Sequence, residues 1–279
     1  MAIRTLDGKT CVITGAASGI GRATALAVAA RGGELVLTDV NEIGLAETAA
    51  LVGRGGGTVL CAHALDVSDF DAVVAFADAV HEKVDSVDVV MNIAGISAWG
   101  TVENLEHRHW KSMVDVNLMG PIHVIERFVP PMIAAGRGGH LVNVSSAAGL
   151  LALPWHAAYS AGKFGLRGVS EVLRFDLKRH GIGVSLVVPG GVRTPLVGTV
   201  QIAGVDRTDP KVEKLTRRFE KHAVTPEKVA SRIVAGIEKN RFMVYTSADV
   251  RFGYWWARKF APPYEFVMQK ANDRFSALL

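Results

Sequence analysis

The stretch Thr10–Gly21 reads TCVITGAASGIG and decides the fold class. Its first five residues form a largely apolar run, which is typical of a strand buried in a sheet. The following stretch, Gly19–Arg31, is rich in alanine and predicts a helix. Between them, Gly15, Gly19 and Gly21 let the backbone turn tightly and approach a pyrophosphate, and the helix N-terminus offers free N–H groups. The spacing is not the common Gly-x-Gly-x-x-Gly, so an ordinary strand–helix turn is the alternative interpretation.

The same alternation of short apolar runs with longer helical patterns continues along the chain. Further strands are predicted at Glu34–Asp39, Thr58–Leu65, Val87–Asn92, Gly139–Ser145, Val184–Val188 and Phe242–Thr246. Helices are predicted at Asn41–Leu51, Asp69–Val84, Leu105–Ala135, Ala157–His180 and Thr225–Lys239, with a glycine-rich loop at Gly53–Gly57. Near-continuous apolar strands that alternate with helices predict a parallel sheet with right-handed crossovers. We therefore expect an α/β fold, a doubly wound, Rossmann-like parallel sheet of about seven strands with helices on both faces.

Composition fits one globular domain with an appendage. The chain has 279 residues, of which 49% are hydrophobic and 21% charged, which excludes disorder. Residues 1–248 are expected to form the domain. Residues 249–279 form an aromatic-rich C-terminal extension, interrupted at Pro262-Pro263. We expect this extension to be helical and to pack on the same domain or on a partner subunit.

Charge and targeting signals exclude several classes of function. The net charge is +4, but 31 Lys and Arg are offset by 27 Asp and Glu without a dense basic block, so no nucleic-acid partner is expected. The N-terminus lacks the apolar region of a secretory signal, and the uncharged stretch Gly138–Gly162 contains too many polar residues for a membrane span. A cytoplasmic protein is expected. Cys11 and Cys61 are too few for a disulfide framework, so we expect buried thiols and no metal site.

An acidic residue ends the second predicted strand. Asp39 lies about 18 residues after Gly21, near the spacing of a carboxylate that accepts hydrogen bonds from an adenosine ribose. It would repel a 2′-phosphate, and neither Ser18 nor Val40 supplies a positive charge nearby. The pattern favours NAD over NADP. The alternative is an aspartate that caps the next turn.

Three further residues predict proton-transfer chemistry. Tyr159 and Lys163 are four apart in a predicted helix and therefore share one face. A neighbouring ammonium lowers the pKa of a phenol from about 10 and makes it a usable acid or base. Ser146, 13 residues upstream at the end of a predicted strand, can hydrogen-bond the same substrate oxygen. The Tyr-Lys pair gains its meaning from this combination, because helix faces produce such pairs by chance.

Together these residues resemble the short-chain dehydrogenase/reductase family, of the single-domain NAD type, over about residues 7–245. Asp66-Val67 resembles the pair that holds the adenine ring, and Asn92-Ile93-Ala94-Gly95 resembles an Asn-Asn-Ala-Gly motif with Ile93 in place of its second Asn. Asn117 matches a helix asparagine, and Ser146, Tyr159 and Lys163 match the catalytic Ser, Tyr and Lys. The resemblance implies cofactor contacts from Gly15, Ser18, Gly19, Ile20, Gly21, Asp39, Asp66, Val67, Asn92, Ala94, Gly95, Tyr159, Lys163, Pro189, Gly190, Val192 and Thr194.

The resemblance also implies roles. Tyr159 would be the general acid/base, and Ser146 would polarise the substrate oxygen. Lys163 would bind the nicotinamide ribose and, with the cationic nicotinamide, depress the pKa of Tyr159. Asn117 would hold a water in a proton relay. Hydride would pass between the substrate carbon and the nicotinamide.

Substrate contacts are expected in the loops that follow the strands, since ligands bind at the carboxyl ends of a parallel sheet. These loops are mostly apolar and favour a lipophilic secondary alcohol or ketone. The candidate residues are Trp99, Ser146, Leu151, Trp155, His156 and Leu196. For Trp99 and Trp155, packing is an equally good interpretation.

Assembly and alternative functions remain to be tested. The helix at Ala157–His180 contains seven Gly, Ala and Ser residues by Gly168, and the resemblance implies that a homodimer or homotetramer forms through it. The tail mixes aromatic and cationic residues, so membrane-surface contact is its less favoured role. The alternative functions are an NADPH-dependent carbonyl reductase, which Asp39 disfavours, and a non-catalytic dinucleotide-binding regulatory protein, which would be expected to lack a catalytic residue.

Overall fold

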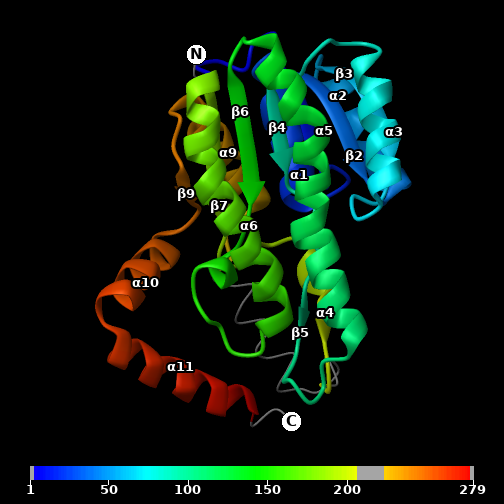
Figure 1. The fold of residues 1–279 in the computed structure, drawn as a ribbon. Helices are drawn as coiled ribbons and strands as arrows, with labels where there is room; N and C mark the ends of the chain where they lie inside the picture. The colour runs from blue at the N-terminus through cyan, green and yellow to red at the C-terminus, as the bar shows by residue number, and fades with distance from the viewer. Residues whose placement is uncertain (1–2, 206–222, 277–279) are drawn as a thin grey trace.

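A computed structural model describes residues 3–205 and 223–276. Its centre is a seven-stranded sheet in which all paired neighbours run parallel, in the order β3-β2-β1-β4-β6-β7-β9 (Figure 1). The strands are β1 (Thr10–Thr14), β2 (Glu34–Asp39), β3 (Thr58–Ala64), β4 (Val89–Asn92), β6 (Gly139–Val144), β7 (Ile182–Val188) and β9 (Met243–Tyr245). The predicted fold class, a doubly wound sheet of about seven strands, is confirmed.

The strand order reverses between β1 and β4. From β1 the chain builds outward to β2 and β3, and then returns to the other side of β1 with β4. In such sheets a crevice opens at the carboxyl ends of the strands on either side of the reversal, and ligands bind there. The glycine turn after β1 therefore lies at the place where this topology forms a binding site.

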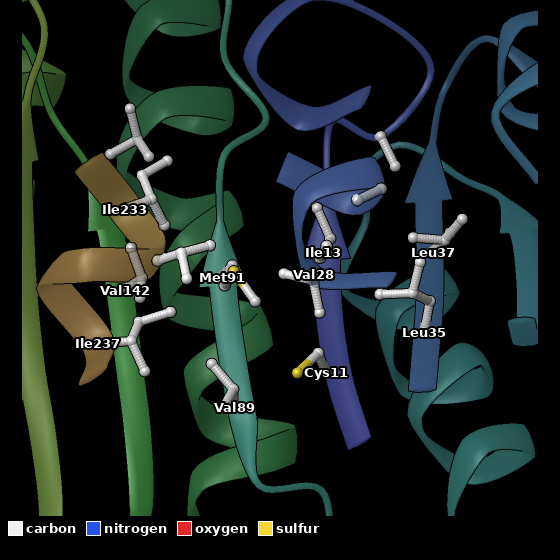
Figure 2. Close-up of a cluster of buried hydrophobic side chains, with 14 of the residues drawn as sticks. Cys11, Ile13, Val28, Leu35, Leu37, Val89, Met91, Val142, Ile233 and Ile237 are labelled. Atoms are coloured by element: carbon white, nitrogen blue, oxygen red, sulfur yellow. The ribbon is translucent and has the colours of Figure 1, made fainter. Parts of the chain in front are cut away.

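Helices cover both faces of the sheet. One face carries α1 (Gly19–Ala29), α2 (Glu42–Arg54) and α9 (Pro226–Glu238); the other carries α3 (Phe70–His81), α5 (Gly120–Ala135) and α6 (Ala157–Asp176) (Figure 1). On the first face, side chains from α1 and α9 pack on β1, β2 and β4 (Figure 2). Cys11 lies fully buried in this cluster, and both cysteines are free and buried as predicted. Burial raises the pKa of each thiol.

Several elements differ from the sequence prediction. Helix α2 continues to Arg54, so the first two residues of the expected loop Gly53–Gly57 are helical. The helical region before residue 135 is divided into α4 (His107–Val114), a five-residue π-helical segment (Asp115–Met119) and α5. Three short elements were not anticipated: β5 (Ala98–Trp99), β8 (Gln201–Ile202), which pairs with it in parallel, and α7 (Pro195–Thr199).

The C-terminal extension forms two helices, α10 (Ala248–Lys259) and α11 (Ala261–Ser276), which extend along one side of the domain beyond the sheet (Figure 1). The break lies at Phe260. Pro262 and Pro263 stand in the first turn of α11, where a missing N–H leaves no helical bond unmade. Contacts to the same chain anchor the pair: Val250 is buried, and the Tyr264 hydroxyl accepts a hydrogen bond from the Ala152 N–H at 2.8 Å. Among the described helices, none combines the length and apolar character that a bilayer span requires.

Candidate active site

The turn between β1 and α1 requires glycine for steric reasons. Gly15 has φ of +71°, and a Cβ there would lie 2.7 Å from the backbone nitrogen of Ala94. A Cβ on Gly21 would lie 1.9 Å from the carbonyl oxygen of Gly15. A side chain at either position would push the turn away from β4 or from α1. The turn is thus held close to both elements, with the N-terminus of α1 open in front of it.

A cleft of about 650 Å³ opens beside this turn, which is within the usual range for small-molecule sites. It is lined from the ends of β1, β2, β3 and β4 and from the segment after β7. The predicted residues that line it are Gly15, Ser18, Gly19, Ile20, Gly21, Asp39, Asp66, Val67, Ala94, Gly95, Thr194 and Leu196. Residues that are 180 positions apart in the sequence therefore share one cavity.

Two carboxylates in the cleft are oriented by nearby backbone. Asp39 accepts hydrogen bonds from the N–H groups of Ala17 and Asn41, both at 2.9 Å. Asp66 accepts from the N–H and the hydroxyl of Ser68. Asp39 thus forms a local turn and also lines the cavity, a position compatible with both interpretations made from the sequence.

Six predicted cofactor residues are absent from the lining of the cleft: Tyr159 and Lys163, which stand beside its end, and four others. Asn92 is buried behind it, and its amide donates to Asn143 Oδ1 at 2.9 Å on the neighbouring strand β6. Pro189 accepts a hydrogen bond from the Ala147 N–H through its carbonyl. Gly190 packs against α10, and Val192 forms an isolated bridge with Val224.

The three residues predicted to act on the substrate converge at the end of β6. Ser146 follows β6 and precedes a short 3₁₀ turn, and Tyr159 and Lys163 lie in the first two turns of α6. The Lys163 ammonium donates to the Val144 carbonyl at 3.0 Å and stands 5.8 Å from the centroid of the Tyr159 ring. The cleft ends beside this group, because a Cβ on Gly95 would lie 3.3 Å from Lys163 Nζ.

The electrostatics of the group differ from the expectation. Burial raises the pKa of Tyr159, and a hydrogen bond with the Ser146 hydroxyl acts in the opposite direction. Burial also lowers the pKa of Lys163 to about 8. In the chain alone, desolvation therefore outweighs the hydrogen bond from Ser146, whereas the depressed pKa expected for Tyr159 also depends on the cationic nicotinamide.

Asn117 lies in the π-helical segment and is fully buried. Its amide makes hydrogen bonds with the backbone of Ile96, a residue that lines the cleft. The segment packs closely on α6, because a Cβ on Gly162 would lie 2.9 Å from the Asn117 Cβ. In this arrangement Asn117 joins the cleft wall to the helix that carries Tyr159.

An aromatic group borders Tyr159 on the side expected for substrate. The rings of Trp99 and His156 lie 4.4 Å apart, and those of His156 and Tyr159 lie 6.2 Å apart. The pKa of His156 is lowered by burial, with a hydrogen bond to the Pro154 carbonyl in opposition. Of the other candidates, Trp155 is buried at 7% exposure with a φ of +64°, and Leu151 packs toward Gly253 of α10.

Sequence reasoning missed part of the cleft wall. The additional lining residues include Leu65, Ser68, Ile93, Ile96, Ser112, Asp115, Val116, Pro195 and Thr199. Ser112, Asp115 and Val116 precede Asn117 within about one helical turn, and this proximity to a predicted site residue could have identified them. Thr199 reaches the cleft from the end of α7, a helix that the sequence patterns did not predict.

Comparisons with known proteins agree with this geometry. Residues 9–203 match the model of the family described as short chain dehydrogenase. "Putative oxidoreductase SadH" of Mycobacterium tuberculosis is 38% identical over 249 residues, 88% of this chain and 89% of its own length. A short-chain dehydrogenase/reductase of Burkholderia phymatum, solved with NAD, superposes with a TM-score of 0.81 at 32% identity, covering 92% of this chain and 96% of its own. A metagenomic short-chain oxidoreductase, solved with NADP, gives 0.68 at 31% identity, with coverage of 86% and 96%. The chain belongs to the short-chain dehydrogenase/reductase family of oxidoreductases.

Proposed function

We propose that the protein transfers hydride between NAD(H) and a lipophilic secondary alcohol or ketone, with Tyr159 as the general acid/base. The observation that carries this proposal is the convergence of Ser146, Tyr159 and Lys163 beside the end of the cleft at Gly95. An intact set of these residues also favours turnover over the alternative of a non-catalytic regulatory protein.

The cleft residues fit a nicotinamide dinucleotide. The turn at Gly15–Gly21 and the open N-terminus of α1 would hold the pyrophosphate, Asp39 would accept from the adenosine ribose, and Asp66 lies where an adenine ring would rest. When bound, the cofactor supplies the hydride acceptor or donor. Related structures contain NAD or NADP, and the carboxylate of Asp39 supports NAD, because it would repel a 2′-phosphate.

The side chains around Tyr159 would handle the substrate oxygen. In oxidation, the Tyr159 phenolate would take the hydroxyl proton of the alcohol while Ser146 donates a hydrogen bond to the same oxygen. The raised pKa of Tyr159 in the protein alone means that the phenolate needs further positive charge, which Lys163 and a cationic nicotinamide would supply together. The neighbouring Trp99 and His156 rings give the substrate side an apolar, aromatic wall.

Assembly through α6 is part of the proposal. Phe164, Val172 and Phe175 on this helix expose 39%, 58% and 64% of their surface, which is unusual for large apolar residues along one helix. We propose that a second copy covers them in a homodimer or homotetramer. Light scattering on the purified protein measures the mass directly.

The test is NADH formation with a panel of lipophilic secondary alcohols, with NAD and NADP in parallel. We expect turnover with NAD on at least one substrate and a lower kcat/KM with NADP. Turnover with NADPH alone would favour the carbonyl-reductase alternative. Binding of NAD without turnover of any substrate would favour the regulatory one.

A further inference from the structure

A second cavity lies at the opposite edge of the sheet from β3, beside the last strand. It has a volume of about 640 Å³ and is bordered by α9, β9 and the beginning of α10. None of its lining residues lines the cofactor cleft. Nothing in the reaction proposed above uses this cavity.

Four cationic side chains surround it. Lys228 and Arg232 come from α9, Arg241 precedes β9, and Arg251 comes from α10. No acidic residue lines the cavity, and within residues 3–205 and 223–276 none of the four forms a salt bridge. Lys228 and Arg232 are also four apart on one helix, where like charges are unfavourable. The fold thus gathers positive charge here without neutralising it.

A buried hydroxyl group without a hydrogen-bond partner among the described residues borders the cavity. Thr246 is 1% exposed and lines the cavity, yet its hydroxyl has no hydrogen-bond partner in the part of the chain that the structure describes. Buried hydroxyls in folded proteins are nearly always paired, so a lone one calls for an explanation. A ligand oxygen in the cavity would supply the missing partner.

The N-terminus of α10 adds donors at the same place. Its cap residue, Ser247, lines the cavity but makes no capping hydrogen bond with its side chain, which leaves first-turn N–H groups available. The helix has 12 residues, and its N-terminal end carries partial positive charge. Asp249 in the first turn is exposed and lies outside the cavity lining.

We propose that this cavity binds a phosphate-bearing anion, held by Arg232, Arg241 and Arg251 with Lys228 and hydrogen-bonded by Thr246. Guanidinium groups match phosphate oxygens in pairs, and helix N-termini favour the same ligand. The volume exceeds the needs of a lone ion, which indicates a phosphate ester. A soluble ester and an anionic lipid headgroup share this chemistry. A second copy related by a two-fold axis would bring the same cations together, so it is a poor occupant of this cavity without an anion between them.

Binding is measured by isothermal titration with inorganic phosphate, pyrophosphate and glycerol 3-phosphate, in the presence of saturating NAD to occupy the glycine turn. Sedimentation with phosphatidylcholine vesicles, with and without phosphatidic acid, tests the lipid source. The double variant Arg232→Gln/Arg241→Gln removes two cations, and Thr246→Val removes the hydroxyl while keeping the shape. Lys178→Gln/Lys239→Gln is the matched control, because both lysines are exposed, lie outside the cavity and carry no salt bridge among the described residues.

We expect saturable binding that weakens about tenfold or more in the double arginine variant and severalfold in Thr246→Val, with the control unchanged. Binding of the soluble phosphates without vesicles identifies a soluble ester, and binding only to vesicles with phosphatidic acid identifies a headgroup. The proposal is overturned by an absence of binding to every probe, or by equal weakening in the arginine variant and the lysine control. Turnover of alcohols with NAD is a separate measurement, so an absence of anion binding does not contradict the proposed reaction.

Discussion

Asn117 holds the backbone of Ile96 at both polar groups: its Oδ1 accepts from the Ile96 N–H at 3.2 Å, and its Nδ2 donates to the Ile96 carbonyl at 3.0 Å. Ile96 lines the cofactor cleft, and Asn117 sits in the π-helical segment that packs on α6. Its side chain therefore fixes the cleft wall relative to the helix that carries Tyr159. This positioning role is additional to the proton relay that the family resemblance implies.

Asn117→Ala is expected to reduce both stability and turnover. Loss of two hydrogen bonds at a buried site costs about 2 kcal/mol in unfolding free energy. A shift of the cleft wall by about 1 Å lowers kcat by up to about 100-fold. Urea unfolding and steady-state kinetics check the two effects, with exposed Asn272→Ala as the control. Unchanged stability together with lost turnover would instead indicate a purely catalytic role.

Two glycines of α6 provide a matched pair. A Cβ on Gly162 would lie 2.6 Å from the Met113 carbonyl oxygen, whereas a Cβ on Gly168 would meet nothing within 4 Å. Gly162→Ala is expected to destabilise the fold by about 1–3 kcal/mol through overpacking. Gly168→Ala is expected to stabilise it by about 0.5–1 kcal/mol through helix propensity. Thermal unfolding of both variants distinguishes the two effects, and destabilisation by Gly168→Ala would indicate that the second copy proposed to cover α6 packs closely on this glycine.

Residue patterns predicted the elements whose signals are local. Strand β2 begins and ends at Glu34 and Asp39 as predicted, because an apolar run stands between a glycine pair and a polar turn. The pairing of β5 with β8 could not be predicted in this way. Each strand has two residues, and the partners Trp99 and Ile202 are about 100 positions apart, so neither periodicity nor turn chemistry marks them.

The residues that form the site could be predicted from the sequence, but the direction of their pKa shifts could not. The 13-residue spacing correctly predicted that Ser146 lies near Tyr159. The direction in which the pKa of Tyr159 shifts depends instead on burial by residues from other elements. Asn92 illustrates a second limit. It ends a cleft-forming strand, but its side chain pairs with Asn143 on β6, and this choice is set by the register of two strands rather than by either sequence.

His140 predicts a pH-dependent stability. The Ser185 hydroxyl donates to the Arg241 carbonyl, so His140 must donate its Nε2–H to Ser185, which leaves the buried Nδ1 without a partner among the described residues. Burial lowers the pKa of His140 from 6.5 to about 4.

Between pH 6.5 and 4, His140 is therefore protonated in the unfolded chain but neutral in the folded protein. The free energy of unfolding consequently falls with decreasing pH, by up to about 3 kcal/mol. Unfolding free energies measured across this range check the slope. His140→Gln should flatten it, whereas His63→Gln, at an exposed position, should not. A slope that survives in His140→Gln would assign it to other groups.

Asp39 predicts the cofactor preference. Its carboxylate is oriented by the Ala17 and Asn41 N–H groups and faces the cleft. Asp39→Ala removes the acceptor for the ribose and the repulsion of a 2′-phosphate, so the Kd for NAD should rise about tenfold while that for NADP stays level or falls. Fluorescence titration of both cofactors measures the ratio, with Asp85→Ala as an exposed control of equal charge change. An unchanged ratio would remove the basis for preferring NAD.

Tyr159→Phe separates chemistry from binding. The substitution removes only the phenolic oxygen, and the neighbouring Lys163 keeps its hydrogen bond to the Val144 carbonyl, so the cleft should retain its shape. Without a proton acceptor for the alcohol, kcat should fall by about 100-fold to 10,000-fold. The Kd for NAD, measured by titration, should stay close to that of the unmodified protein. Tyr245→Phe, at the far edge of the sheet on β9, is the control and should turn over normally. Activity retained in Tyr159→Phe would exclude this residue as the acid/base and return the assignment to another group near Ser146.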